Sequence, residues 1–162
     1  MFRDADPERF AWLAAFRTYL GASAALNLAW EALQLPLYAI WQTGNARELA
    51  FAVAHCTLGD VLIALSTLSL GLVIAGHGEW PRRQQLLVAI VAIILGVAYT
   101  VYSEHLNVAI RQSWAYADRM PVIRGFGWQI GVSPILQWMV VPTLALWIIA
   151  RRQRRGQPTP PQ

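Results

Sequence analysis

Residues 86–98 read LLVAIVAIILGVA, an aliphatic run without a charged or amide side chain. With its flanks it forms the segment 84–107, which is as long as the roughly 20 helical residues that cross a bilayer. Three further segments have the same apolar character, namely 17–41, 48–75 and 129–150. Long stretches of Leu, Ala, Ile and Val favour helices over the short alternating strands of a membrane barrel. The sequence therefore predicts an all-α, polytopic membrane protein built as a four-helix transmembrane bundle.

The composition supports this class. Of the 162 residues, 56% are hydrophobic and 14% are charged, so the chain is more apolar and less charged than an ordinary soluble domain. We expect one transmembrane domain over residues 1–150 and a disordered, basic and Pro-rich cytoplasmic tail over 151–162. Cys56 is the single cysteine, which excludes an intramolecular disulfide.

The arginines suggest how these four crossings are oriented. The chain has 13 basic residues, all of them Arg, and most lie near the two termini or between the second and third apolar segments. Because loops rich in basic residues stay in the cytoplasm, we expect both termini there, in a bacterial inner (plasma) membrane. The lack of Lys beside abundant Arg and Ala suggests a GC-rich bacterial source. Contact with anionic lipid accounts for the net charge of +4, so no nucleic-acid partner is expected.

A polar stripe interrupts the first apolar segment. Asn27, Glu31, Gln34 and Tyr38 are spaced by four, three and four residues, so they share one face of a helix. Pro36 removes a backbone donor within this stretch and is expected to kink or end the helix. A carboxylate in an apolar helix is costly unless it meets a partner or water. The other segments should therefore supply polar groups that face the stripe.

Polar side chains do occur at a similar depth in the other three segments. The second segment contains His55 and Asp60, the third contains Glu104, and the fourth contains Gln137. At the helical rise of about 1.5 Å per residue, all four lie in the outer half of the membrane. Three acids on three helices are more than helix packing requires, so we predict a polar cavity open to the periplasm. A purely structural polar network is the alternative.

The connection 112–128 is too polar to span a membrane, yet it is rich in aromatic residues. Such a segment can lie at the level of the lipid headgroups or fold over the end of the bundle. We therefore predict an outer amphipathic loop or lid between the third and fourth helices.

The leading functional hypothesis is a membrane-embedded enzyme that acts on a lipid-like or other apolar substrate. Glu31 and His55 would perform acid–base chemistry, while Asp60 and Glu104 would assist them or bind a cation. If these four side chains converged, they would also suit a divalent metal such as Fe, Mn or Zn. The residues expected to hold the substrate are Asn27, Gln34, Tyr38, Tyr99, Tyr102, Arg111, Tyr116, Arg124, Gln137 and Trp138.

Two other functions fit the same pattern. The chain would serve as an accessory or assembly subunit of a larger membrane complex if its small-residue faces and outer loop dock onto partners. A small transporter is disfavoured, because the aliphatic inner halves of the helices show no polar path unless the chain oligomerises.

Overall fold

The computed structural model describes residues 7–125 and 127–155, with the side chains of 12–125 and 127–154. Its long helices are α1 (Pro7–Gln34), α3 (Ala46–Ala75), α4 (Gln85–Glu104) and α5 (Val132–Arg155). Its shorter elements are η1 (Leu35–Leu37), α2 (Ile40–Thr43), the π-helical segment η2 (His105–Ile110), β1 (Val122–Gly125) and β2 (Trp128–Gly131). The first residues of the predicted tail continue α5 as helix, and 156–162 lie outside the described residues.

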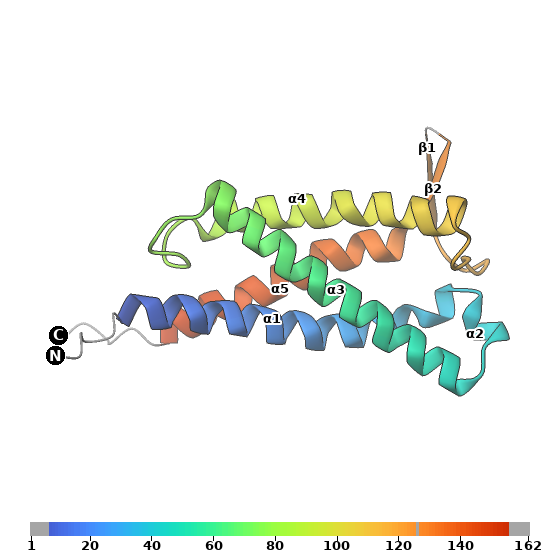
Figure 1. Ribbon diagram of the computed structural model, residues 1–162, viewed down its shortest axis with the longest axis horizontal. Coiled ribbons are helices and arrows are strands. Elements are labelled where there is room, and N and C mark those ends of the chain that lie inside the picture. The colour runs from blue at the N-terminus through green and yellow to red at the C-terminus, as the bar shows by residue number, and fades with distance from the viewer. Residues whose placement is uncertain (1–6, 126, 156–162) are drawn as a thin grey trace.

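The four long helices form a bundle in which each packs against two neighbours, in the order α1, α3, α4, α5 around the ring (Figure 1). α1 begins and α5 ends at one end of the bundle, which is named the terminal end here. The β1–β2 hairpin projects from the opposite end, named the hairpin end.

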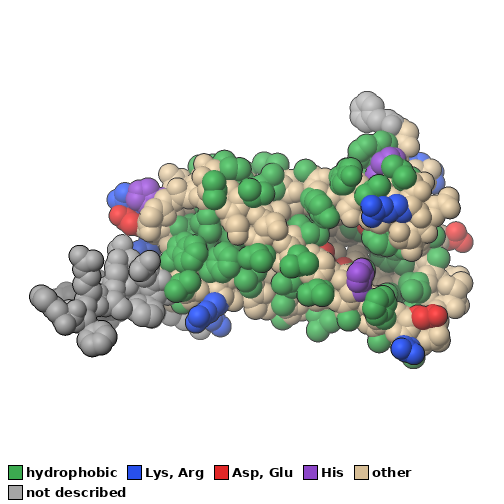
Figure 2. Space-filling model, viewed as in Figure 1, with side chains coloured by type: hydrophobic (Ala, Val, Ile, Leu, Met, Phe, Trp, Pro, Cys, Tyr) green, Lys and Arg blue, Asp and Glu red, His purple; other side chains and the backbone are tan. Residues whose placement is uncertain are grey.

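Three helices are long and apolar enough to cross a membrane, namely Ala46–Ala75, Gln85–Ile110 and Val132–Arg154. Their outward faces expose large aliphatic side chains, such as Val73 at 83% and Leu86 at 75%. Figure 2 shows hydrophobic side chains spread along the middle of the bundle, with basic side chains toward its two ends. Because lipid accepts such a surface and water does not, the chain is a helical, membrane-embedded protein.

α1 differs from the other long helices. It has 28 residues but is not among the three that are apolar enough to span, so the expected four crossings are supported for three. Its buried face carries polar side chains, among them Asn27, Glu31 and Gln34, which lower the hydropathy of the whole helix. The expected effect of Pro36 is confirmed, since α1 ends at Gln34 and a single 3-10 turn containing Pro36 follows.

The terminal half of the bundle holds the aliphatic core. Leu68, Val88, Ala145 and Ile149, contributed by α3, α4 and α5, are almost completely buried there. Trp80, in the turn between α3 and α4, packs against the same core and is 2% exposed. This half of the bundle is therefore held mainly by hydrophobic packing.

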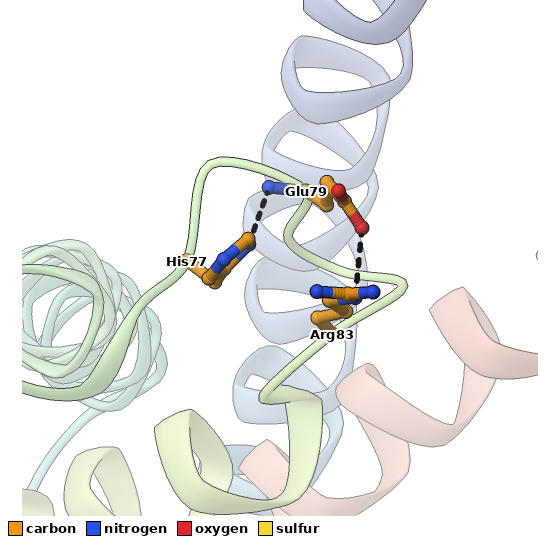
Figure 3. A network of polar contacts seen from close by, with 3 residues as sticks. All are labelled: His77, Glu79 and Arg83. Atoms are coloured by element: carbon orange, nitrogen blue, oxygen red, sulfur yellow. Dashed lines mark hydrogen bonds and ion pairs between the residues drawn. The ribbon is translucent and has the colours of Figure 1, made fainter.

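The turn between α3 and α4 is itself organised by polar contacts (Figure 3). The backbone N–H of Glu79 donates a hydrogen bond to Nδ1 of His77 at 3.2 Å, and the Glu79 carboxylate pairs with Nε of Arg83 at 2.9 Å. Both contacts are exposed, so they add little stability and chiefly shape the turn.

α3 crosses α4 closely at the terminal end and diverges from it toward the hairpin end (Figure 1). At the close approach, a Cβ added to Gly71 would lie 3.1 Å from the carbonyl oxygen of Val88. A larger residue at Gly71 would therefore push the two helices apart. The space-filling view shows a hollow on this face, toward the hairpin end (Figure 2).

The segments that follow α1 and α4 pair with each other at the hairpin end. The N–H of Ala39 donates to the carbonyl of Ala115, and the N–H of Ala117 donates to that of Leu37, each at 2.9 Å. The predicted loop 112–128 thus contains a short antiparallel pairing and the first strand of the hairpin. Its closing motion as a lid stays a prediction.

Gly96 offers a direct test of the packing between α4 and α5. A Cβ added to Gly96 would lie 2.2 Å from Cε3 of Trp138, whose side chain is only 3% exposed. Gly96→Ala is therefore expected to lower the free energy of unfolding by about 1–3 kcal/mol, because the indole cannot move aside without strain. The melting temperature of the purified protein in detergent measures this loss.

Gly59→Ala is the matched control, since a Cβ at Gly59 in α3 meets nothing within 4 Å. Alanine favours a helix over glycine, so this variant should melt at or above the wild-type temperature. Equal melting temperatures for the two variants would contradict the packing of Gly96 on Trp138.

Candidate functional site

Polar side chains from all four long helices meet in the half of the bundle nearer the hairpin end. Most of this group is buried, with Glu31 and Gln137 8% and 2% exposed, and its remaining members are partly buried. The group is called the polar cluster below and consists of Asn27, Glu31, Gln34, Asp60, Glu104, Tyr116, Ser133 and Gln137.

The carboxamide of Gln137 is the centre of the cluster. Its Nε2 lies 3.0 Å from Oδ1 of Asn27, 3.0 Å from Oε1 of Glu31 and 2.8 Å from Oδ2 of Asp60. A carboxamide nitrogen carries only two hydrogens, so these three acceptors compete for them. One side chain of α5 therefore holds α1 and α3 together through hydrogen bonds.

Gln34 fixes the position of Glu31 from the same helix. Its Nε2 donates to Oε1 of Glu31 at 2.7 Å, and its Oε1 accepts a hydrogen bond from the Ser133 hydroxyl at 2.8 Å. The indole N–H of Trp30 also lies 3.2 Å from that oxygen. α5 thus holds the Asn27, Glu31 and Gln34 part of the predicted stripe. The prediction is wrong for Tyr38, which lies beyond the end of α1 in extended backbone, because the helix ends before Pro36.

Glu104 is hydrogen-bonded by a residue at the hairpin end, Tyr116. The hydroxyl of Tyr116 donates a hydrogen bond to its Oε2 and accepts one from the N–H of Gly131 at 2.9 Å. Burial raises the pKa of Tyr116 above its ordinary value, and the hydrogen bond to Glu104 adds to the shift. The hydroxyl consequently keeps its proton at neutral pH and continues to donate. Glu104 ends α4, and the π-helical segment η2 begins at the next residue, an irregularity that is frequent at functional sites.

Three carboxyl groups share this interior. Oxygens of Glu31 and Asp60 lie 3.0 and 2.8 Å from the same nitrogen, so they are less than about 6 Å apart. Glu31 is also within electrostatic reach of Glu104. Among the described residues, no basic side chain forms an ion pair with any of the three acids, and both Arg111 and Arg124 are exposed. The cluster is therefore rich in acceptors and lacks a built-in positive charge.

Figure 2 shows how this interior meets the surface. A hollow opens on the face where α3 and α4 diverge, toward the hairpin end, and acidic side chains are visible inside it. The polar cluster is therefore reached from the side of the bundle, between two apolar helices. A molecule lying in the lipid could approach it by this route.

Several residues predicted for the site lie elsewhere. His55 is exposed on α3 and stacks on the ring of Phe51, with 5.5 Å between the centroids. Tyr99 and Tyr102 are also exposed on α4, at 49% and 56%. The structure thus does not bring these three side chains to the acids, because each points outward from its helix.

Tyr38 and Trp138 lie beside the cluster. The ring of Tyr38 packs against that of Tyr116 with 5.7 Å between the centroids, and the two residues form an isolated antiparallel bridge. The Trp138 indole neighbours the carboxyl group of Asp60. Both aromatic residues can therefore line a bound molecule.

The metal hypothesis finds no support in the geometry. No group of three or more His, Cys, Asp or Glu side chains among the described residues is arranged to hold a metal ion. The set proposed from the sequence fails because His55 faces outward, while Glu104 is held from the opposite side by Tyr116.

Sequence reasoning missed two buried polar residues of α1. Tyr19 and Ser23 are both 0% exposed, and neither hydroxyl has a hydrogen-bond partner of ordinary geometry. Ser23 lies among small residues, a pattern that also indicates close helix packing. Its spacing of four residues from both Tyr19 and Asn27 was the available signal, since that spacing continues the polar stripe toward the terminal end.

Comparison with known proteins does not identify a family for this chain. No family model matches the chain, and neither the characterised proteins nor the solved structures contain a significant match. The function is therefore argued from the polar cluster itself.

Substitution of Gln137 tests whether its hydrogen bonds stabilise the polar cluster. Gln137→Leu keeps a side chain of comparable size but removes the donor shared by Asn27, Glu31 and Asp60. We expect the free energy of unfolding to fall by about 2 kcal/mol or more, measured by denaturation in mixed micelles.

Gln129→Leu is the control for this change, because Gln129 is an exposed residue of β2. The control should unfold like the wild type. Equal stability of both variants would mean that Gln137 does not organise the cluster.

Proposed function

We propose that this chain is an enzyme of the bacterial inner (plasma) membrane that acts on an amphiphilic, lipid-like substrate by acid–base chemistry. The observation that carries the proposal is that Glu31 and Asp60 share the Gln137 donor while Glu104 is bonded to Tyr116 nearby, with no ion pair to a basic side chain among the described residues. Ionisable groups inside a membrane protein are costly and commonly mark a functional site. The lateral hollow gives a membrane-borne molecule a route to them.

In the proposed enzyme, α1 is a fourth membrane crossing. α1 packs against both α3 and α5, two of the helices that are apolar enough to span. A helix so placed lies at the same depth in the membrane, and its polar face is shielded from lipid by its neighbours. Four crossings put both termini on one side, and the arginines near the termini favour the cytoplasm for that side.

The chemistry of the cluster points to a class of headgroup. Its carboxyl and carboxamide oxygens are acceptors, so a bound group should donate hydrogen bonds or carry a positive charge. A long-chain amine or alcohol meets this requirement, whereas a fatty acid would add a fourth carboxylate. The rings of Trp30 and Tyr38 could stabilise a cationic headgroup further. The acyl chain would lie in the gap between α3 and α4.

Each group then has a role in the proposed reaction. Glu31 and Asp60 exchange a proton with the substrate, since they lie close together and share the Gln137 donor. Glu104, held by Tyr116, binds the headgroup from the opposite side. Asn27 and Gln34 position the headgroup. His55, given an acid–base role on sequence grounds, takes no part in this arrangement, because it stacks on Phe51 at the surface.

Binding of matched amphiphiles tests the proposed headgroup. We expect dodecylamine and dodecanol to bind the protein in nanodiscs, and dodecanoate to bind about tenfold more weakly or not at all. Quenching or shifting of tryptophan fluorescence reports binding, because Trp30 and Trp138 border the cluster.

Variants then locate the bound headgroup. Asp60→Asn and Glu104→Gln keep the size of each side chain and should weaken dodecylamine binding by about tenfold. His55→Ala should bind like the wild type. Equal affinity for all three amphiphiles, or a loss in His55→Ala alone, would contradict the proposed site.

An accessory subunit of a larger membrane complex is the second candidate, and one observation favours it. The β1–β2 hairpin projects beyond the helices (Figure 1), and Ile123 and Arg124 on β1 are exposed there. An exposed strand with free backbone groups is a ready surface for another chain. In this function the polar cluster would serve only to hold the helices together.

Affinity purification in mild detergent tests this candidate. An accessory function predicts that Ile123→Asp releases a stoichiometric partner, while Asp60→Asn retains that partner. A chain that purifies without any partner, and whose dodecylamine binding depends on Asp60, would exclude the accessory function.

A further inference from the structure

The β1–β2 hairpin stands across the direction of the long helices. Figure 1 shows it beside the end of α4, extending past that helix on the side away from α1 and α5. α4 with its π-helical continuation, Gln85–Ile110, is long and apolar enough to cross a membrane. A spanning helix runs roughly along the membrane normal, so a ribbon that crosses its direction runs roughly along the membrane surface. The hairpin therefore extends over whatever surrounds the end of α4.

The hairpin has one apolar face and one polar face. In its register Ile123 pairs with Ile130, and Arg124 pairs with Gln129. Paired residues share a face of a ribbon, and so do residues two apart along one strand. One face therefore carries Ile123, Ile130 and Trp128, and the other carries Arg124 and Gln129. Such a division suits a ribbon that lies between an apolar medium and water.

The bundle covers only part of the apolar face. Ile130, near the base of the hairpin, is 5% exposed. The indole of Trp128 stacks on the imidazole of His105, with 4.2 Å between the ring centroids and 6° between the ring planes, and it is still 38% exposed. Ile123 is 55% exposed. The apolar face thus rests on the end of α4 by one aromatic contact and is open beyond it.

Lipid is the medium that fits the open part of this face. Tyr102 and Ile110, which flank His105 in sequence, are exposed on α4 and its continuation, so the apolar face adjoins the lipid-facing surface of a spanning helix. Tryptophan and tyrosine are enriched where a membrane meets water. The free backbone groups of an edge strand need water and cannot enter the hydrocarbon. The hairpin therefore belongs at the level of the lipid headgroups.

We propose that the hairpin is an interfacial anchor, whose Ile123, Ile130 and Trp128 face lies against the phospholipids around the end of α4. Its Arg124 and Gln129 face is turned to water and headgroups, where the guanidinium can pair with a lipid phosphate. The direction of the hairpin favours lipid over a protein partner, because a docking edge offered to the aqueous phase would point away from the membrane along the bundle axis. The inference goes beyond the proposed enzyme function, since the anchor contacts lipid whether or not a substrate binds.

The anchor also sets the depth of Glu104. His105, on which Trp128 stacks, is the next residue, about 1.5 Å further along the helix axis. Glu104 consequently lies close beneath the headgroups. An amphiphile bound to Glu104 would keep its headgroup near the depth that it has in the leaflet, and this consequence alone rests on the proposed function.

Spin labels on the two faces of the hairpin test the anchor. Cys56, the single cysteine, is replaced by Ala, and a nitroxide is attached through Ile123→Cys or Gln129→Cys in nanodiscs of phosphatidylcholine and phosphatidylglycerol. Both positions are exposed and accept a label. We expect collisions with a water-soluble nickel chelate to be about fivefold rarer for the Ile123 label than for the Gln129 label. Collisions with oxygen, which dissolves in lipid, should show the reverse order.

A third label, attached through Ile94→Cys, is the lipid reference. Ile94 is 60% exposed midway along α4, so its label should meet oxygen and little nickel chelate when the chain is folded and inserted. Equal nickel accessibility of the Ile123 and Gln129 labels would overturn the proposal and assign the hairpin to a protein partner. Dipolar broadening between Ile123 labels would also overturn it, because that result would place a second copy of the chain on the apolar face.

Tryptophan quenching checks the anchor without a label. The emission of Trp128 is the difference between the wild type and Trp128→Phe, a variant that keeps an aromatic ring against His105. Lipids brominated near the headgroup should quench this emission about twofold more than lipids brominated at the chain end. Emission that neither lipid quenches would contradict the anchor. No amphiphile is added in either experiment, so both outcomes are independent of the dodecylamine binding that tests the proposed function.

Discussion

The carboxamide of Gln137 is the contact on which the polar half of the bundle depends. Without it, Asp60 and Asn27 would lose this donor and Glu31 would keep the one from Gln34, in a medium of low dielectric. Hydrophobic packing cannot perform this task, because lipid competes equally well for aliphatic side chains. The bundle thus combines an aliphatic half that is simply packed with a polar half in which hydrogen bonds determine how the helices meet.

This division into an aliphatic and a polar half explains which features could be predicted from the sequence. The long aliphatic runs predicted the helices, and Pro36 predicted the end of α1 at Gln34. The spacing of Asn27, Glu31 and Gln34 predicted a buried polar face, which the structure confirms. These features follow from local periodicity and from the cost of burying polar groups, both of which can be read along one helix.

Other parts of the site depend on how separate helices rotate about their axes, which one sequence does not specify. His55 and Asp60 lie five residues apart, yet only Asp60 turns toward Gln137. Tyr116 reaches Glu104 because the segments after α1 and α4 pair through their backbones, a contact without a side-chain signature. Ser23 was overlooked because a serine in a membrane helix is ordinarily satisfied by its own backbone.

The backbone pairing at the hairpin end also governs how the site can open. It ties the continuation of α1 to that of α4, two helices that stand diagonally across the ring. α5 is joined to α1 by the hydrogen bonds of Gln137 and Ser133. Among the described residues, α3 is joined to α5 at that end by the hydrogen bond from Gln137 to Asp60, and the hollow lies beside it (Figure 2). Any wider opening of this face would therefore have to break the hydrogen bond from Gln137 to Asp60, while the close contact of α3 with α4 at Gly71 could stay in place.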